Sequence, residues 1–138
     1  MAFHARAPRS KYGVRTDALG KLLRTVDGIL FDSLAEVRRY RELCALLRAG
    51  AIDSIELQPR FPLVVASTSG LASQAASALA GTFDGRVGHY VADFRYEDER
   101  GRTVIEDVKG GPTTAVYRLK RKMVEKQYGI QITEVRYR

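Results

Sequence analysis

The chain has 138 residues, a length that suits one domain, and hydrophobic residues make up 45% of it, enough for one modest core. Its formal net charge is +7, and no apolar run is long enough to span a membrane. The N-terminal residues lack the apolar centre of a signal peptide and the lone Cys44 excludes an internal disulfide, so we expect a cytoplasmic protein.

The first part of the chain is expected to form an arm and a helix. Residues 1–24 lack periodicity and are rich in Arg, Lys and Gly, which predicts a flexible basic arm in front of a single domain at 25–138. Ser33 and Glu36 match a capping box, so a helix is expected to begin there and to run to Ala49.

The rest of the chain combines strands with a second helix. Apolar alternation and turn residues predict strands at 54–65, 87–97, 103–109 and 130–137, and a helix at 113–128. Turn chemistry between the second and third strands predicts an antiparallel hairpin. On the helix, Val116, Leu119 and Met123 are expected to face inward. These elements indicate an α/β domain in which helices pack on a sheet.

Residues 66–86 interrupt this pattern with a run of Ala, Ser, Gly and Thr that carries almost no charge. The run is consistent with a loose insertion and also with a short helix at 72–80. Because its side chains are small and mostly uncharged, we expect no chemistry from it.

Two acidic residues and a lysine fall on the predicted hairpin. Asp107 and Lys109 are two apart on one strand and therefore share a face, whereas Glu106 and Val108 point to the other face. Asp93 lies in the middle of the neighbouring strand and can lie beside Asp107, although the sequence does not fix the register. Glu106 is therefore expected to be structural.

Such a set suits metal-assisted cleavage of a phosphodiester. Mg²⁺ takes one or two carboxylates and keeps several waters, so Asp93, Asp107 and the carbonyl of Val108 are candidate ligands. Lys109 could orient or deprotonate the attacking water, or stabilise the leaving oxygen. The alternative is a surface ion pair, because Asp-x-Lys on a strand is common by chance.

Further segments follow in one order along the chain. They are Lys11-Tyr12-Gly13, residues 27–33, Glu36 with Arg39-Tyr40 and Glu42-Leu43, Leu57-Gln58-Pro59, residues 90–94, residues 106–110 and residues 116–120. Together they resemble the PD-(D/E)XK nuclease superfamily, and within it a phage- and prophage-associated family of small proteins related to Holliday-junction resolvases. Residues 66–86 depart from that pattern, and Ala92 replaces the proline that precedes the first aspartate.

The resemblance implies a restriction-endonuclease-like core, a mixed sheet flanked by helices. It implies that Asp93 and Asp107 bind the metal and that Lys109 is the catalytic lysine. Glu36 matches the helical glutamate that lies near the metal in the superfamily, a role compatible with helix capping. Gln58 occupies a motif position near the sheet edge and is a possible site residue; the alternative is a plain polar residue on a strand.

The implied activity is that of a Mg²⁺-dependent DNA endonuclease, with Mn²⁺ able to substitute, acting on branched DNA such as a four-way junction. A resolvase cuts two strands symmetrically, so the resemblance also implies a C₂ homodimer. If the chain is phage-encoded, its location would be the host cytoplasm. One alternative is a non-catalytic DNA-binding protein that keeps the fold. Another is an RNA-directed nuclease or binder, although no aromatic-rich single-strand platform is evident.

The charge is unevenly distributed along the chain. Residues 1–24 carry six Lys or Arg and one Asp, residues 109–138 carry eight and two Glu, and residues 25–108 carry nine basic and thirteen acidic side chains. Basic ends suit a polyanion such as DNA, although they can also be a solvated surface. The candidate phosphate contacts are Lys11 and Arg15 in the arm and Arg118, Lys120, Arg121, Lys122 and Lys126 on the second helix.

Other common sites are not indicated. His4 and His89 are far apart and lack the spacing of metal ligands; His4 is expected to belong to the arm and His89 to a strand surface, where it could touch DNA. The chain has no glycine-rich nucleotide loop and no Cys/His zinc pattern, so no nucleotide cofactor is expected.

Overall fold

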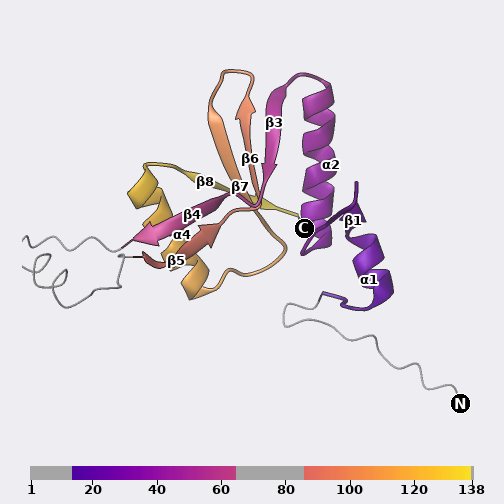
Figure 1. Ribbon diagram of the computed structural model, residues 1–138, viewed down its shortest axis with the longest axis horizontal. Coiled ribbons are helices and arrows are strands. Elements are labelled where there is room, and N and C mark those ends of the chain that lie inside the picture. Colours follow the sequence, from indigo (N-terminus) through magenta and orange to yellow (C-terminus); the bar gives the residue numbers. More distant parts are fainter. Residues whose placement is uncertain (1–13, 65–85, 138) are drawn as a thin grey trace, which may run out of the picture.

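The computed structural model describes residues 14–64 and 86–137, which fold into helices and strands around one central sheet (Figure 1). In chain order these elements are α1 (Ala18–Leu23), β1 (Thr25–Val26), β2 (Ile29–Leu30), α2 (Leu34–Arg48), β3 (Ile52–Leu57), β4 (Arg60–Val64), β5 (Arg86–Val91), β6 (Phe94–Asp98), β7 (Thr103–Lys109), α4 (Ala115–Tyr128) and β8 (Ile132–Arg136). Lys11, His4 and nearly all of the expected insertion at 66–86 lie outside the described residues. None of the described helices is long and apolar enough to cross a membrane.

The central sheet is mixed, as the sequence predicts. Its strand order is β3-β6-β7-β8, with antiparallel pairing between the first three strands and parallel pairing between β7 and β8. The β7–β8 connection carries α4, as a parallel connection requires a crossover. The chain is therefore a mixed α/β protein whose sheet is flanked by helices.

The four strands β3, β4, β5 and β6 form one antiparallel ribbon that bends in the middle (Figure 1). The bend lies where Gln58-Pro59 faces Ala92-Asp93: the Gln58 N–H donates to the Asp93 carbonyl at 3.0 Å, and the Ala92 N–H donates to the Pro59 carbonyl at 3.2 Å. The expected continuous strands at 54–65 and 87–97 are therefore each broken in two. Proline contributes to the break because it fixes φ and has no N–H to donate.

Alternation along β7 separates two cores. Val108 packs with Val37 and Leu43 of α2 on one face, whereas Ile105 packs with Val124 of α4 on the other. Residues of odd number on this strand thus face α4 and residues of even number face α2. This confirms that Asp107 and Lys109 share a face and that Glu106 points away from them.

The expectation of a flexible arm up to residue 24 is wrong for its described part. Asp17 caps α1 by accepting a hydrogen bond from the Gly20 N–H at 2.9 Å. Arg24 is buried and donates to the carbonyls of Gly20, Phe31 and Arg15, which ties the segment to the turn before α2. A guanidinium that binds backbone carbonyls in this way leaves no periodic signal in the sequence.

The predicted orientation of the second helix is also wrong. Val116 and Leu119 on α4 are 63% and 60% exposed, while Tyr117, Arg121 and Val124 turn towards the sheet. The stripe that the helix buries is amphipathic rather than apolar, because Tyr117 and Arg121 find acidic partners on β7 and β8. Only Met123 of the three expected apolar positions packs against the core.

Candidate active site

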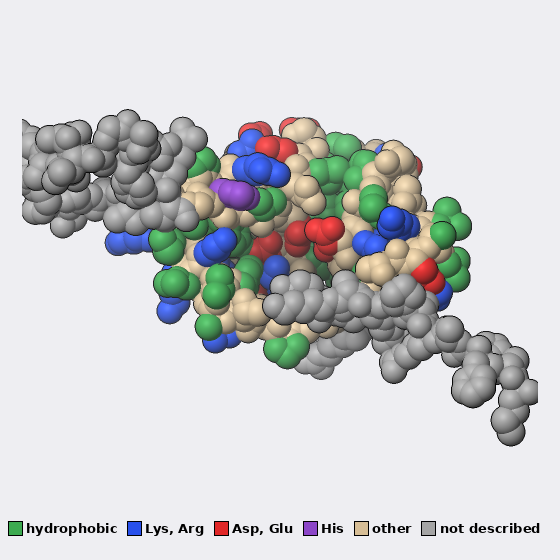
Figure 2. All heavy atoms as spheres, turned by 60° about the horizontal axis from the view of Figure 1, so that its bottom comes forward, with side chains coloured by type: hydrophobic (Ala, Val, Ile, Leu, Met, Phe, Trp, Pro, Cys, Tyr) green, Lys and Arg blue, Asp and Glu red, His purple; other side chains and the backbone are tan. Residues whose placement is uncertain are grey.

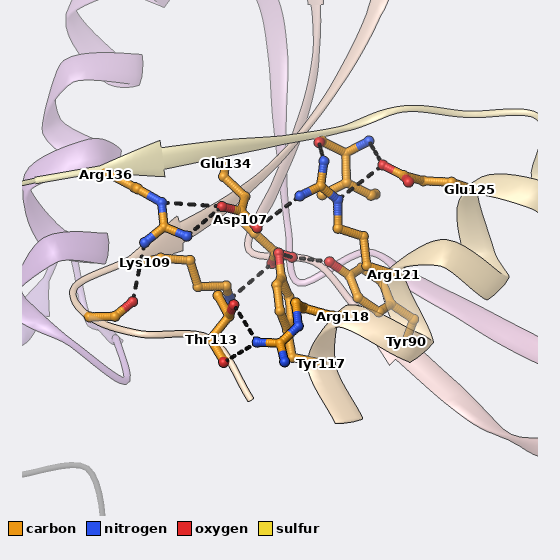
Figure 3. A network of polar contacts seen from close by, with 12 residues as sticks. Tyr90, Asp107, Lys109, Thr113, Tyr117, Arg118, Arg121, Glu125, Glu134 and Arg136 are labelled. Carbon is orange, nitrogen blue, oxygen red and sulfur yellow. Dashed lines mark hydrogen bonds and ion pairs between the residues drawn. The ribbon is translucent and has the colours of Figure 1, made fainter. Parts of the chain in front are cut away.

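Asp107 lies in the middle of the sheet with almost no exposure to solvent. Only 1% of its surface is accessible. Its Oδ2 accepts hydrogen bonds from the hydroxyls of Tyr90 on β5 and Tyr117 on α4, the latter at 2.9 Å (Figure 3). Burial raises the pKa of this carboxyl, against the opposing effects of the Lys109 charge and the Tyr117 hydroxyl. Asp107 is thus a desolvated carboxylate whose orientation two phenols fix.

Asp93 occupies the bend of the ribbon, next to the point where β6 begins. Its Oδ2 accepts a hydrogen bond from the backbone N–H of Val108 at 2.6 Å, so the carboxylate takes the place of a strand partner for β7. Burial raises the pKa of Asp93, while the Val108 N–H and the Lys109 charge oppose that rise. The bend brings Asp93 to the same end of β7 as Lys109.

Lys109 links the two aspartates electrostatically. Its Nζ lies 3.7 Å from Asp107 Oδ1 and 4.3 Å from the centre of the Tyr117 ring, a cation–π distance. Its charge also lowers the pKa of both Asp93 and Asp107 relative to burial alone. The structure therefore brings the predicted Asp93, Asp107 and Lys109 together around one cation.

Glu36 reaches this centre from the first turn of α2. Ser33 is the N-cap, and the Glu36 carboxylate accepts hydrogen bonds from the Ser33 hydroxyl at 2.8 Å and from the Asp32 N–H at 3.1 Å. The capping box is therefore confirmed. Burial and the neighbouring Asp93 charge raise the pKa of Glu36 to about 7 despite these hydrogen bonds. Glu36 is thus both a cap and a buried acid facing Asp93.

Glu106 contrasts with its neighbour Asp107. Its carboxylate accepts two hydrogen bonds from the Arg39 guanidinium, at 2.8 and 2.7 Å, and one from the Tyr96 hydroxyl at 2.7 Å. This bidentate pair joins α2 to β7 on the face away from Lys109. The structural role expected for Glu106 fits this arrangement.

Two hollows open beside the carboxylates, and Glu36 borders both. The larger, of about 500 Å³, is lined by Lys109, Tyr117 and the turn at 110–114. The smaller, of about 210 Å³, is lined by Gln58 and Asp93 with several apolar side chains. Figure 2 shows acidic side chains gathered at the centre of this face, with basic side chains around them. Asp107 borders neither hollow and lies behind them.

The carboxylates fit a Mg²⁺ ion in one specific respect. In Asp93, the Val108 N–H holds Oδ2, and Oδ1 accepts none of the hydrogen bonds found in the described residues. In Asp107, the two phenols hold Oδ2, and Oδ1 faces Lys109 Nζ at 3.7 Å. Holding one oxygen from behind is how proteins orient a carboxylate ligand. The Val108 N–H points at Asp93, and because the N–H and C=O of a strand residue point to one side, its carbonyl faces that side too. Among the described residues no three His, Cys, Asp or Glu side chains form a metal cluster, but Mg²⁺ needs only one or two carboxylates.

The basic residues expected to contact DNA divide into two groups. Arg15 pairs with Asp17, Arg118 donates to the Thr113 carbonyl, and Arg121 bonds Glu125, Glu134 and the Ile132 carbonyl. These three serve the fold. The exposed basic residues of α4 are Arg118, Lys120, Lys122 and Lys126, and of these only Arg118 makes a side-chain hydrogen bond within the described residues.

The sequence did not identify the two tyrosines on Asp107. Tyr90 lies three residues before Asp93, and Tyr117 lies in the first turn of the helix that follows Lys109. For Tyr117, the only local signal is a tyrosine in the first turn of the helix that follows the strand carrying Asp107. For Tyr90, contact depends on how β5 lies against β7, which a sequence does not specify.

Comparison with known proteins gives one family. A family model described as "Protein of unknown function (DUF1064)" matches residues 9–136. No curated protein and no solved structure matches the chain. The likeness to PD-(D/E)XK nucleases therefore stays a prediction from the sequence.

Proposed function

The chain belongs to the protein family of unknown function DUF1064, and because that description assigns no activity, we propose one from the site: a Mg²⁺-dependent DNA endonuclease with a PD-(D/E)XK core. The observation that carries the proposal is the convergence of Asp93 and Asp107 on Lys109. Both aspartates are desolvated; Asp93 Oδ1 accepts no hydrogen bond within the described residues, and Asp107 Oδ1 faces the Lys109 ammonium. Carboxylates that are costly to ionise without a counterion are typical of metal sites.

Each residue of the site has a separate role in this proposal. Asp93, Asp107 and the Val108 carbonyl would hold Mg²⁺, which when bound neutralises phosphate charge and lowers the pKa of water. Tyr90 and Tyr117 keep the Asp107 carboxylate in one orientation. The Lys109 ammonium faces the large hollow, where it can orient a water or stabilise a leaving oxygen.

Glu36 adds a group that can exchange a proton near neutral pH. Its pKa of about 7 lets the carboxyl accept a proton from a water, or return one, under ordinary conditions. It borders both hollows, so it can act on a water between them.

DNA is the substrate that the charge supports. The exposed lysines Lys120, Lys122 and Lys126 lie on α4, whose first turn borders the large hollow, and the chain carries +7 overall. Branched DNA and a C₂ homodimer, both implied by the sequence resemblance, complete the proposal.

The decisive experiment incubates the protein with labelled four-way junction, flap, single-stranded and linear duplex DNA, in Mg²⁺, Mn²⁺ or EDTA. Asp107→Asn and Lys109→Ala are compared with Asp53→Asn, which removes an exposed carboxylate at the far end of β3. We expect the wild type and Asp53→Asn to cut junction DNA in either metal, and the other two variants to lose at least about 100-fold in rate.

Two results would contradict the proposal. Cleavage that survives EDTA, or that survives in both site variants, excludes the metal mechanism. Tight junction binding by a wild type that never cuts would favour the non-catalytic DNA-binding alternative. Sedimentation of the protein on junction DNA tests the dimer separately.

A further inference from the structure

Gln58 adopts a backbone conformation that side chains other than glycine rarely take. Its φ is +50°, in the left-handed region, although the residue is a glutamine followed by a buried proline. The hydrogen bond from its N–H to the Asp93 carbonyl holds it there. Strained residues of this kind persist when the surrounding structure forces them, and they concentrate at functional sites.

The strain places Gln58 at the smaller hollow, beside Asp93 and Glu36. Its side chain is exposed, and within the described residues its amide has no hydrogen-bond partner. The remaining lining is apolar: Ile29, Leu30, Phe31, Leu57 and Phe94. A polar amide at the mouth of an apolar hollow is typical of a binding pocket for a small ring system.

The charges of the two hollows differ. The larger contains Lys109 and the hydroxyls of Thr113 and Thr114, which suit a phosphate. The smaller contains two carboxylates and no basic side chain, so it repels anions. Its volume of about 210 Å³ is of the order of a one- or two-ring aromatic, since a cavity of ~150 Å³ holds a benzene.

We propose that the smaller hollow binds one unstacked nucleobase next to the cleaved phosphate, and that the Gln58 amide hydrogen-bonds its edge. A glutamine amide offers both a donor and an acceptor, as a base edge requires. Unstacking costs least where the DNA is branched or single-stranded, so the pocket favours such substrates over intact duplex. The inference rests on the proposed DNA substrate but not on turnover.

The test measures binding in EDTA, so that cleavage plays no part. Junction DNAs carrying a single abasic site at each position near the cut are titrated against the wild type and Gln58→Gly. For the wild type we expect one position at which base removal weakens binding about tenfold. Gln58→Gly should bind intact DNA about tenfold more weakly and show no further loss at that position. 2-Aminopurine placed there should brighten when the wild type binds, because its base leaves the stack.

Ser54→Gly is the matched control. Ser54 also has a left-handed φ, of +49°, but lies on β3 outside the hollow. Glycine relieves strain at either position, so both variants should keep a Tm equal to that of the wild type or up to roughly 3 °C above it. Only Gln58→Gly should lose the base-dependent affinity, and Gln58→Asn, which keeps an amide and tolerates the conformation, should recover part of it.

The outcomes separate the two proposals. If the wild type binds or cuts DNA but no abasic position matters, or if Gln58→Gly keeps the same abasic penalty, the base pocket is overturned and the nuclease proposal stands. If Gln58→Gly lowers only the cleavage rate, Gln58 acts on the chemistry and the pocket is again overturned. If the wild type binds no DNA, both proposals fail.

Discussion

At the scale of single residues, the two faces of β7 show how neighbouring carboxylates acquire different roles. Glu106 is buried with a complete set of partners, a guanidinium and a phenol. Asp107 is buried with two phenols and a lysine Nζ at 3.7 Å, and burial still raises its pKa. A fully compensated carboxylate stabilises a fold, whereas an under-compensated one is available for a cation.

This difference predicts that neutralising Glu106 destabilises the fold much more than neutralising Asp107 does. Glu106→Gln should lower the free energy of unfolding by about 3 kcal/mol, because Arg39 loses its main counterion in a partly buried site. Asp107→Asn should change it by less than about 1 kcal/mol, since the amide oxygen still accepts from both phenols. Urea unfolding with an unchanged m-value measures both. Asp107→Asn should abolish cleavage. If instead Asp107→Asn unfolds far more easily and Glu106→Gln keeps the stability of the wild type, Asp107 is the structural carboxylate and Glu106 is not.

Glu36 predicts a pH dependence of stability. Its folded pKa of about 7 lies above its ordinary 4.5, so the folded state holds the proton more tightly. The proton therefore stabilises the fold below pH ~4.5, and that contribution is lost as the pH rises towards 7. Glu36→Gln removes this dependence. Relative to the wild type, the variant should gain stability between pH 4.5 and 8, by at most about 3 kcal/mol.

The measurement is urea unfolding of both proteins at pH 4.5 and pH 8 without divalent ions. Asp93 and Asp107 titrate in both proteins, so their effects largely cancel in the difference. Equal differences at the two pH values would show that Glu36 ionises in the folded protein as it does in the unfolded chain.

At the scale of elements, local signals predicted α2 and α4 but not α1, and apolar spacing predicted the wrong orientation for α4. Ser33 and Glu36 cap α2 as the capping box indicates, and Gly129 ends α4 with a left-handed φ of +64°. The side of α4 that meets the sheet was not predictable from apolar spacing. Tyr117 and Arg121 are half-buried because Asp107 and Glu134, on the strands β7 and β8 that flank the helix, accept their hydrogen bonds.

The orientation of α4 predicts which of its cations bind DNA. Lys120 and Lys122 are exposed, so Lys120→Gln or Lys122→Gln should each reduce the slope of log affinity against log salt by about 1. Arg121→Gln should leave that slope unchanged and lower the free energy of unfolding by about 1 kcal/mol, because Arg121 is already paired with Glu125 and Glu134. Fluorescence anisotropy titrations of labelled DNA at about 50 to 200 mM salt distinguish the lysine variants from Arg121→Gln. An unchanged slope in both lysine variants would place the DNA elsewhere.

At the scale of the whole molecule, Asp93 reaches Asp107 and Lys109 because the ribbon formed by β3, β4, β5 and β6 bends. Strand parity placed Asp107 and Lys109 on one face from the sequence alone. Strand parity could not place Asp93. Its side chain accepts from the Val108 N–H because β6 begins only after it, at Phe94, so no residue of β6 pairs with Val108. The sequence predicted one strand through Gln58-Pro59, and the opposite segment Ala92-Asp93 has no turn residue that marks a bend.

Because the bend gathers acidic groups around one lysine, the proposed metal site predicts that the stability of the whole fold depends on Mg²⁺. The proposed Mg²⁺ site exists only in the folded protein, so Mg²⁺ should raise the free energy of unfolding by about 2.7 kcal/mol at a concentration 100 times Kd. Burial raises the pKa of Asp93, Asp107 and Glu36, and the metal competes with their protons, so the gain should be larger at pH 8 than at pH 5. Thermal unfolding with Mg²⁺ or EDTA at both pH values measures it. Asp93→Asn and Asp107→Asn should lose the gain and Asp53→Asn should keep it; a gain that all three variants retain would mean that Mg²⁺ binds away from the bend.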